Sequence, residues 1–216
     1  GWDVTASPGV TAREGMNKLT PVTNWRGYCS KYNYAVGTTD GGENAVTGYI
    51  FEKMNASDKK DVNDRGNSKG LNTLLYDFKA YKANFILGDY FVALGAGVTN
   101  AKPAMEGGIR TTIDQTAHIG AVTVIEKGKE KPLQEGRQSL ITFEGQPVWV
   151  MQEGKFAYRV LPEFTRKAFV LTETCPTNWI KRNRGNAKKG DLPQTVDILR
   201  LWVDHGPVSY THLRAH

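Results

Sequence analysis

Hydrophobic and polar residues alternate with a period of two along much of this chain, and no segment shows a convincing helical period. The clearest alternation lies at residues 196–204. There Leu199 and Leu201 fall on one face of a strand, and Arg200 and Trp202 fall on the other. This segment therefore predicts a β-strand with one face towards a core.

Further strands are predicted where short runs rich in β-branched and aromatic residues are separated by turn residues about every ten positions. These runs are residues 32–37, 45–53, 82–87, 90–98, 109–116, 121–126, 139–143, 147–152, 155–161 and 168–173. Residues 71–81 alternate imperfectly, which leaves a strand there open. Many strands joined by short turns are typical of a sandwich, so we expect an all-β fold, an antiparallel β-sandwich.

Two-residue links rich in glycine and polar residues predict the hairpins of this sandwich. Gly88-Asp89, Gly145-Gln146 and Glu153-Gly154 each stand between two predicted strands. Residues 1–31 and 55–69 carry turn residues and charges with little periodicity, and we expect them to be loops.

Composition and charge exclude some classes of function but do not identify one. The chain has 216 residues, 23 of them glycine, and a formal net charge of +6. A modest basic excess suits an acidic polymer as partner. No basic helix, zinc-binding pattern or aromatic RNA-binding signature points to nucleic acid, and no apolar run reaches the roughly 20 residues that span a membrane. The two cysteines, Cys29 and Cys175, form no metal-binding pattern, and whether they pair stays open.

One known family shares a set of landmarks with this chain. The first lies within residues 82–115, where the matching positions are Phe85, Ala93-Leu94-Gly95, Val98, Asn100, Thr111-Thr112 and Gln115. Three others lie at residues 7–11 (Ser-Pro-Gly-Val-Thr), 177–183 (Thr-Asn-Trp-Ile-Lys-Arg-Asn) and 201–206 (Leu-Trp-Val-Asp-His-Gly). In these landmarks and their order the chain resembles the central β-domain of polysaccharide lyase family 8, the hyaluronate, chondroitin and xanthan lyases.

The resemblance implies a supersandwich-type domain over residues 1–207. We expect this domain to be a fragment of a longer protein, truncated at both ends. The last nine residues, VSYTHLRAH, look like translated sequencing adaptor, so we expect residues 208–216 to be a non-native tail.

The resemblance also implies a reaction and a location. Lyases of this family cleave uronic-acid-containing polysaccharides by β-elimination, which needs a neutralised carboxylate, a base and an acid. In the family these groups are Asn, His, Tyr and Arg of an N-terminal helical toroid, and a Glu near the start of the β-domain assists. All of them would lie upstream of residue 1, so we expect no catalytic residue here, no cofactor, and a missing toroid domain of the same chain as partner. The polymeric substrate implies a secreted or periplasmic protein.

The residues agree with a chain that lacks a catalytic set. Outside the tail there are two histidines: we expect His205 to be a structural residue of a turn and His118 to be exposed. Asp114 and Gln115 are strand neighbours that point to opposite faces and cannot easily share one substrate.

The best candidates for substrate contact are Asn24, Trp25 and Arg26, because an indole offers a flat face to a sugar ring and a guanidinium can bind a carboxylate through two hydrogen bonds. The alternative for Trp25 is a ring that closes the edge of the sandwich. Arg13 is a further candidate at the rim of the cleft.

Three other tryptophans, Trp149, Trp179 and Trp202, are expected to pack within the sheets, and the place of Trp2 stays open. We therefore expect a fragment of a polysaccharide lyase that binds an acidic polysaccharide. The alternative is a non-catalytic carbohydrate-binding or structural β-sandwich module, with neither nucleic acid nor a membrane as partner.

Overall fold

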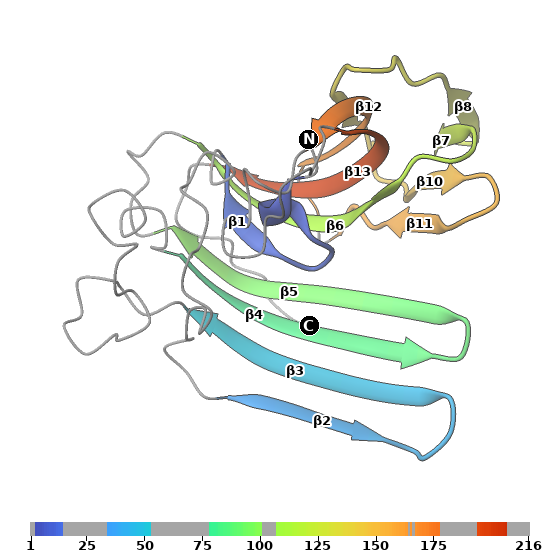
Figure 1. Cartoon of the computed structure of the whole chain (residues 1–216). Coiled ribbons are helices and arrows are strands. Elements are labelled where there is room, and N and C mark those ends of the chain that lie inside the picture. Colours follow the sequence, from blue (N-terminus) through green and yellow to red (C-terminus); the bar gives the residue numbers. More distant parts are fainter. Residues whose placement is uncertain are drawn as a thin grey trace. The chain divides into compact units, whose positions relative to one another are not determined.

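The computed structural model describes residues 3–14, 34–52, 78–100, 107–163, 165, 167–177 and 194–206, and these are almost entirely strands and turns (Figure 1). The strands are β1 (Thr11–Arg13), β2 (Ala35–Thr39), β3 (Asn44–Glu52), β4 (Phe78–Leu87), β5 (Tyr90–Asn100), β6 (Ile109–Ala117), β7 (Val122–Glu126), β8 (Lys129–Lys131), β9 (Ser139–Ile141), β10 (Val148–Gln152), β11 (Ala157–Val160), β12 (Lys167–Thr177) and β13 (Gln194–Gly206). A 3₁₀ turn, η1 (Val4–Ala6), precedes them. No described helix is long and apolar enough to cross a membrane.

The chain divides into two compact units. Unit 1 holds Gly1–Thr11, Arg110–Lys181 and Asn186–His205, and unit 2 holds Ala12–Ile109, Arg182–Gly185 and Gly206–His216. Each unit is described by itself below.

Unit 1 contains two antiparallel layers. One sheet has the strand order β1-β6-β13-β12-β9, and the other has the order β11-β10-β7-β8. The end of β1 (Ala12 and Arg13) and the first residue of β6 (Ile109) are counted in unit 2. The longest pairing runs along β12 and β13, from Lys167 opposite Asp204 to Thr177 opposite Gln194. Because alternate residues of each strand point inward, the two sheets bury one row of side chains each against the other.

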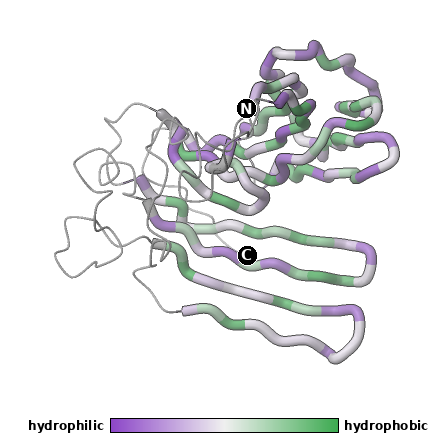
Figure 2. Tube along the Cα trace, viewed as in Figure 1, coloured by the Kyte–Doolittle hydropathy of each residue, from purple (hydrophilic) through white to green (hydrophobic). Residues whose placement is uncertain are grey.

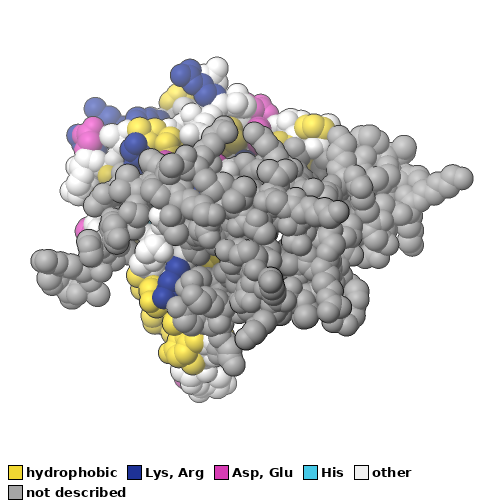
Figure 3. Space-filling view, turned by 90° about the vertical axis from the view of Figure 1, so that its left-hand side faces the viewer, with side chains coloured by type: hydrophobic (Ala, Val, Ile, Leu, Met, Phe, Trp, Pro, Cys, Tyr) yellow, Lys and Arg dark blue, Asp and Glu magenta, His cyan; other side chains and the backbone are white. Residues whose placement is uncertain are grey.

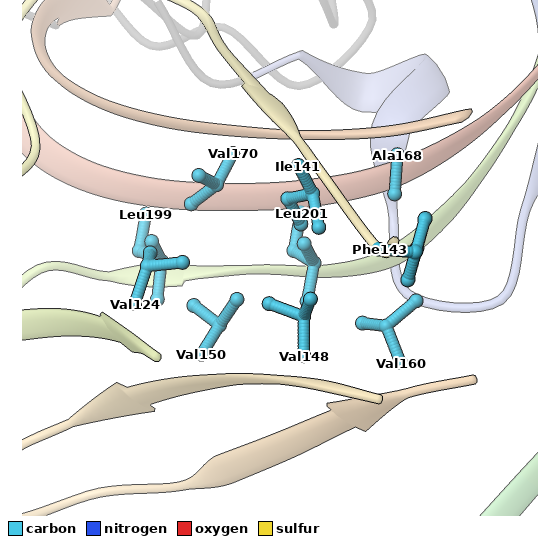
Figure 4. Packing of buried hydrophobic residues seen from close by; sticks show 10 residues of the cluster. All are labelled: Val124, Ile141, Phe143, Val148, Val150, Val160, Ala168, Val170, Leu199 and Leu201. Carbon is cyan, nitrogen blue, oxygen red and sulfur yellow. The ribbon is translucent and has the colours of Figure 1, made fainter. Parts of the chain in front are cut away.

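The core of unit 1 lies between these layers, as Figure 4 shows. Leu199 and Leu201 of β13 meet Val148 and Val150 of β10, and all four are almost completely buried. The other buried members are Val124, Ile141, Phe143, Val160, Ala168 and Val170. Aliphatic side chains thus fill the space between the sheets, and their removal from water stabilises the sandwich.

Unit 2 contains a sheet of four strands in the order β2-β3-β4-β5. Gly88 and Asp89 form the tight turn between β4 and β5, with Gly88 at a φ of 58°. Hydrophobic stretches recur along β3, β4 and β5, and the turns at the ends of the hairpins are polar (Figure 2). Large apolar side chains on β4 and β5 stay exposed, among them Tyr90 at 75% and Phe91 at 66%. Figure 3 shows hydrophobic side chains gathered over this sheet.

The structure confirms the all-β prediction and most of the predicted strands. The hairpin links at Gly88-Asp89 and Glu153-Gly154 are confirmed, since β4 pairs with β5 and β10 pairs with β11. Trp202 is buried and stacks on Phe169 at 5.6 Å between ring centroids, as expected of a tryptophan within a sheet.

Three local expectations were wrong. Residues 1–31 are not a continuous loop, because η1 and β1 lie within them. The Gly145-Gln146 link is a crossover between two sheets, since β9 pairs with β12 whereas β10 pairs with β7 and β11. The short strand β8 was missed, because its sequence Lys-Glu-Lys carries no hydrophobic alternation. The predicted loop at residues 55–69 lies outside the described residues.

Candidate functional site

Three of the sequence landmarks meet in one hydrogen-bonded chain of side chains in unit 1. The hydroxyl groups of Thr11 on β1 and Thr111 on β6 lie 2.7 Å apart. The Thr111 hydroxyl also lies 2.8 Å from Nε2 of His205 on β13. The three strands are neighbours in the sheet, so residues nearly 200 positions apart are brought together by strand order. We expected His205 to lie in a turn, but it lies within β13, and its ring is bound to the Thr111 hydroxyl.

The turn before β1 is fixed to β6 by backbone hydrogen bonds. The amide of Gly9 donates to the carbonyl of Thr112, and the amide of Thr112 donates to the carbonyl of Val10. Gly9 adopts a φ of 76°, a conformation that glycine takes at little cost. This geometry explains why a Ser-Pro-Gly segment stands before the strand.

A buried polar network holds the N-terminal segment against the same sheet. Asp3 Oδ2 and Arg110 Nη2 are 2.5 Å apart, and their side chains are 4% and 10% exposed. Gln115 binds the backbone of Asp3 twice: its Oε1 accepts from the Asp3 amide at 3.1 Å, and its Nε2 donates to the Asp3 carbonyl at 2.8 Å. Arg200 donates to the same Gln115 Oε1 through Nε at 3.2 Å and Nη2 at 3.0 Å.

Charge within the network is balanced by these contacts. Burial alone would raise the pKa of Asp3, but hydrogen bonds from Thr5 and the positive charges of Arg110 and Arg200 outweigh it, so this pKa lies below its usual value. Burial lowers the pKa of Arg200, and the carboxylates of Asp3 and Glu173 oppose that effect. Both groups therefore stay charged at neutral pH, and the network is suited to holding structure.

The neighbours Asp114 and Gln115 go to different partners, which confirms the prediction that they point to opposite faces. Asp114 Oδ2 accepts from the Tyr158 hydroxyl at 2.5 Å, whereas Gln115 joins the network around Asp3. Burial raises the pKa of Tyr158, and the hydrogen bond to Asp114 and its negative charge raise it further. The phenol is thus held protonated well above neutral pH.

The predicted substrate contacts divide into two groups. Asn24, Trp25 and Arg26 lie outside the described residues. Arg13 is fully buried, and its Nη2 donates to Asn100 Oδ1 at 2.5 Å and its Nη1 to the Gly107 carbonyl at 2.7 Å. In this structure Arg13 ties β1 to the residues around it, and contact with substrate stays a prediction.

Within the part of the chain that the structure describes, histidines and acids form no metal site. His118 is half-buried, whereas we expected it to be exposed, and its amide donates to the Asp197 carbonyl. Among the described residues no three His, Cys, Asp or Glu side chains could hold a metal ion together. Cys175 is buried on β12, and Cys29 lies outside the described residues, so whether the two cysteines pair stays open.

Trp149 was expected to pack within the sheets, and this expectation was wrong for its side chain. The residue lies on β10, but its side chain is 40% exposed. The alternation along β10 predicts this exposure. Val148 and Val150 on either side point into the core, so the ring between them must point outward. Asp3 and Arg110 were missed for another reason, because their pairing across more than a hundred residues leaves no local pattern.

A family model for the super-sandwich domain of polysaccharide lyase family 8 matches residues 1–213. The chain therefore belongs to this family. A comparison with curated proteins found no match.

Solved structures of lyases share the fold. A xanthan lyase of Paenibacillus aligns with a TM-score of 0.64 at 21% identity, over 92% of this chain and 16% of that one. A chondroitinase AC lyase, solved in oligosaccharide complexes, aligns with a TM-score of 0.67 at 23% identity, over 97% and 26%. The chondroitin AC lyase of Streptomyces coelicolor A3 gives a TM-score of 0.58 at 22% identity, over 94% and 21%. The chain thus spans about a sixth to a quarter of the length of these structures.

Proposed function

We propose that this chain is the super-sandwich part of a polysaccharide lyase that cleaves a uronic-acid-containing polysaccharide by β-elimination. The observation that carries the proposal is the family match over residues 1–213, together with a sheet that joins the landmarks at Thr11, Thr111 and His205. In this role the domain supplies one wall of the substrate cleft and supports a helical domain that carries the proton-transferring groups.

The described side chains favour support over catalysis. The ionisable groups of the Asp3 network are bound to one another and buried, so they offer no base to a substrate proton. The predicted contacts Asn24, Trp25 and Arg26 are proposed to line the cleft wall, and Arg13, which is fully buried in this structure, is proposed to hold β1 at its rim. A polymeric substrate outside the cell implies secretion or export to the periplasm.

The test is a lyase assay on the full-length gene product. Elimination leaves an unsaturated sugar that absorbs in the ultraviolet, so we expect absorbance to rise with hyaluronan, chondroitin sulfate or xanthan. A full-length protein that leaves all uronic-acid polymers intact would refute the proposal.

The second candidate is a non-catalytic carbohydrate-binding module, and the exposed ring of Trp149 is the observation that favours it. The sequence upstream of the chain separates the two candidates. A helical region with Asn, His, Tyr and Arg supports the lyase, and a direct junction to an unrelated module supports the binding protein.

A further inference from the structure

The outer face of the four-stranded sheet in unit 1 carries an aromatic ring beside unneutralised positive charge. Trp149 lies on β10, a central strand of the order β11-β10-β7-β8. The register places it opposite Arg159 of β11 on one side and Ile125 of β7 on the other. These three residues therefore share one face of the sheet, opposite the core.

A hollow of about 580 Å³ lies at this ring. Its lining residues are Ile125, Lys127, Gly128, Gln146, Pro147, Trp149 and Arg159. Two of them are cations, one is an amide, and the rest are apolar or lack a side chain, so the hollow combines a flat apolar wall with several hydrogen-bond donors.

The two cations differ in their availability. Lys127 forms an ion pair with the carboxylate of Glu144. The guanidinium carbon of Arg159 lies 6.0 Å from the centre of the Trp149 ring, and no described carboxylate pairs with this arginine. One carboxylate, that of Glu130, stands in the same row because Glu130 pairs with Ile125. Arg159 lies at the other end of the row, next to Trp149, and can receive an anion.

We propose that this surface is a binding site for an acidic sugar unit. The pyranose would stack its C–H face on the indole of Trp149, whose π face is electronegative. The carboxylate or sulfate of the same sugar would accept hydrogen bonds from the guanidinium of Arg159, which fits such groups through two parallel bonds. Gln146 offers an amide to the sugar hydroxyls. The site would hold the polymer to the protein at a second point.

The class of ligand rests on the proposed function, whereas the position of the site rests on Trp149 and Arg159. The competing explanation is that Arg159 simply covers the ring through a cation–π contact within the protein. The two explanations differ in whether an acidic polysaccharide binds to the chain at Trp149 and Arg159.

The test is electrophoresis of the 216-residue chain in native gels that contain chondroitin sulfate, with dextran as the neutral polymer. We expect chondroitin sulfate alone to retard the chain. Trp149→Ala and Arg159→Gln should each weaken binding about fivefold or more, which is the loss expected for one stacking or one charged contact. Trp149→Phe keeps an aromatic face, so it should retain most of the binding that Trp149→Ala loses.

The matched control is Phe156→Ala. Phe156 is 56% exposed beside the same hairpin, but it packs edge-on against Tyr158, whose side chain faces the core and not the hollow. Its loss should leave retardation unchanged. Far-UV circular dichroism confirms that each variant is folded, and if Trp149→Ala fails to fold, Arg159→Gln decides.

Retardation that is equal for all variants, or equal in dextran, would overturn the site. Loss of binding in Phe156→Ala to the same extent would overturn it too, since the ring in the hollow would then have no special role. The lyase assay on the full-length protein is independent of these gels. Turnover without retardation contradicts only this inference, and retardation without turnover contradicts only the proposed function.

Discussion

The sandwich of unit 1 and the β2–β5 sheet of unit 2 are both built from strands rich in apolar residues but differ in how far those residues are buried. In unit 1, Leu201 and Val150 are fully buried between two sheets. In unit 2, Leu94 of β5 is 47% exposed and Phe91 is 66% exposed, although both are as apolar as the core residues. A smaller cluster of Ala12, Ala80, Val98 and Ile109 buries the other end of that sheet.

An apolar strand pattern therefore predicts a strand but does not determine whether the strand is buried. A strand gains its stability when a second layer removes its apolar face from water, and a contiguous exposed apolar face marks a place where another surface can bind. The energetics of the two regions should therefore differ strongly for equal substitutions.

The largest contrast is expected for one leucine in each region. Leu201→Ala leaves a cavity between two packed layers and should lower the free energy of unfolding by about 3–4 kcal/mol. Leu94→Ala removes an exposed side chain and should cost less than about 0.5 kcal/mol. Urea unfolding followed by tryptophan fluorescence measures both. Equal losses would show that β5 is as well covered as β13.

A nearly equal loss is expected in the buried network of unit 1. Arg110→Met removes the ion-pair partner of a buried carboxylate and should cost about 3 kcal/mol, because Asp3 then keeps its charge with fewer partners. Arg137→Met, at an exposed arginine, is the control and should be near neutral. Urea unfolding measures both variants. An unchanged free energy of unfolding for Arg110→Met would mean that the Asp3–Arg110 ion pair does not hold the N-terminal segment.

The next contrast is between a Gly→Ala substitution in unit 1 and one in unit 2. At Gly120 an added Cβ would collide with the backbone carbonyl of Glu153, so Gly120→Ala should cost about 2 kcal/mol. At Gly95 on β5 nothing lies within 4 Å of such an atom, and Gly95→Ala should be neutral or stabilise by up to about 0.5 kcal/mol. Thermal unfolding compares them, and a reversed order would contradict the described packing.

The most gradual effect concerns pH and unit 2. Burial lowers the pKa of Lys82 on β4 to about 8, whereas the unfolded chain keeps its proton up to about 10.5. Between these values the unfolded state binds more protons, so stability should rise with pH, by about 1.4 kcal/mol for each pH unit. Below pH 8 both states are protonated and this contribution is constant.

Lys82→Met is the control for that titration. The substituted chain should lose the rise in stability between pH 8 and 10.5 when unfolding is measured at several pH values. A rise that persists unchanged would assign it to other groups.

Much of the fold could be predicted because alternation is a local signal. The strands at residues 90–98 and 196–204 were found from their side chains alone, and both are part of longer strands in the structure. The strand at Thr11–Arg13 could not be found, since three residues give no period and its partner β6 lies about a hundred residues away.

The candidate site was only partly predictable for the same reason. That His205 is structural followed from its place at a strand end, but its bond to Thr111 depends on strand order, which no local pattern encodes. The alternation placed Arg200 on the strand face opposite Leu199 and Leu201, but its partner Gln115 could not be named from the sequence. The exposure of Trp149 could have been read from the two inward valines beside it.

The most direct measurement is a lyase assay on the isolated 216-residue chain, with circular dichroism to confirm its β-structure. In the proposed function the proton-transferring groups lie on a helical domain and this chain forms only a wall of the cleft, so we expect no rise in ultraviolet absorbance with any uronic-acid polymer. Sustained release of unsaturated sugar by this chain would contradict that expectation and would place the catalytic residues within it.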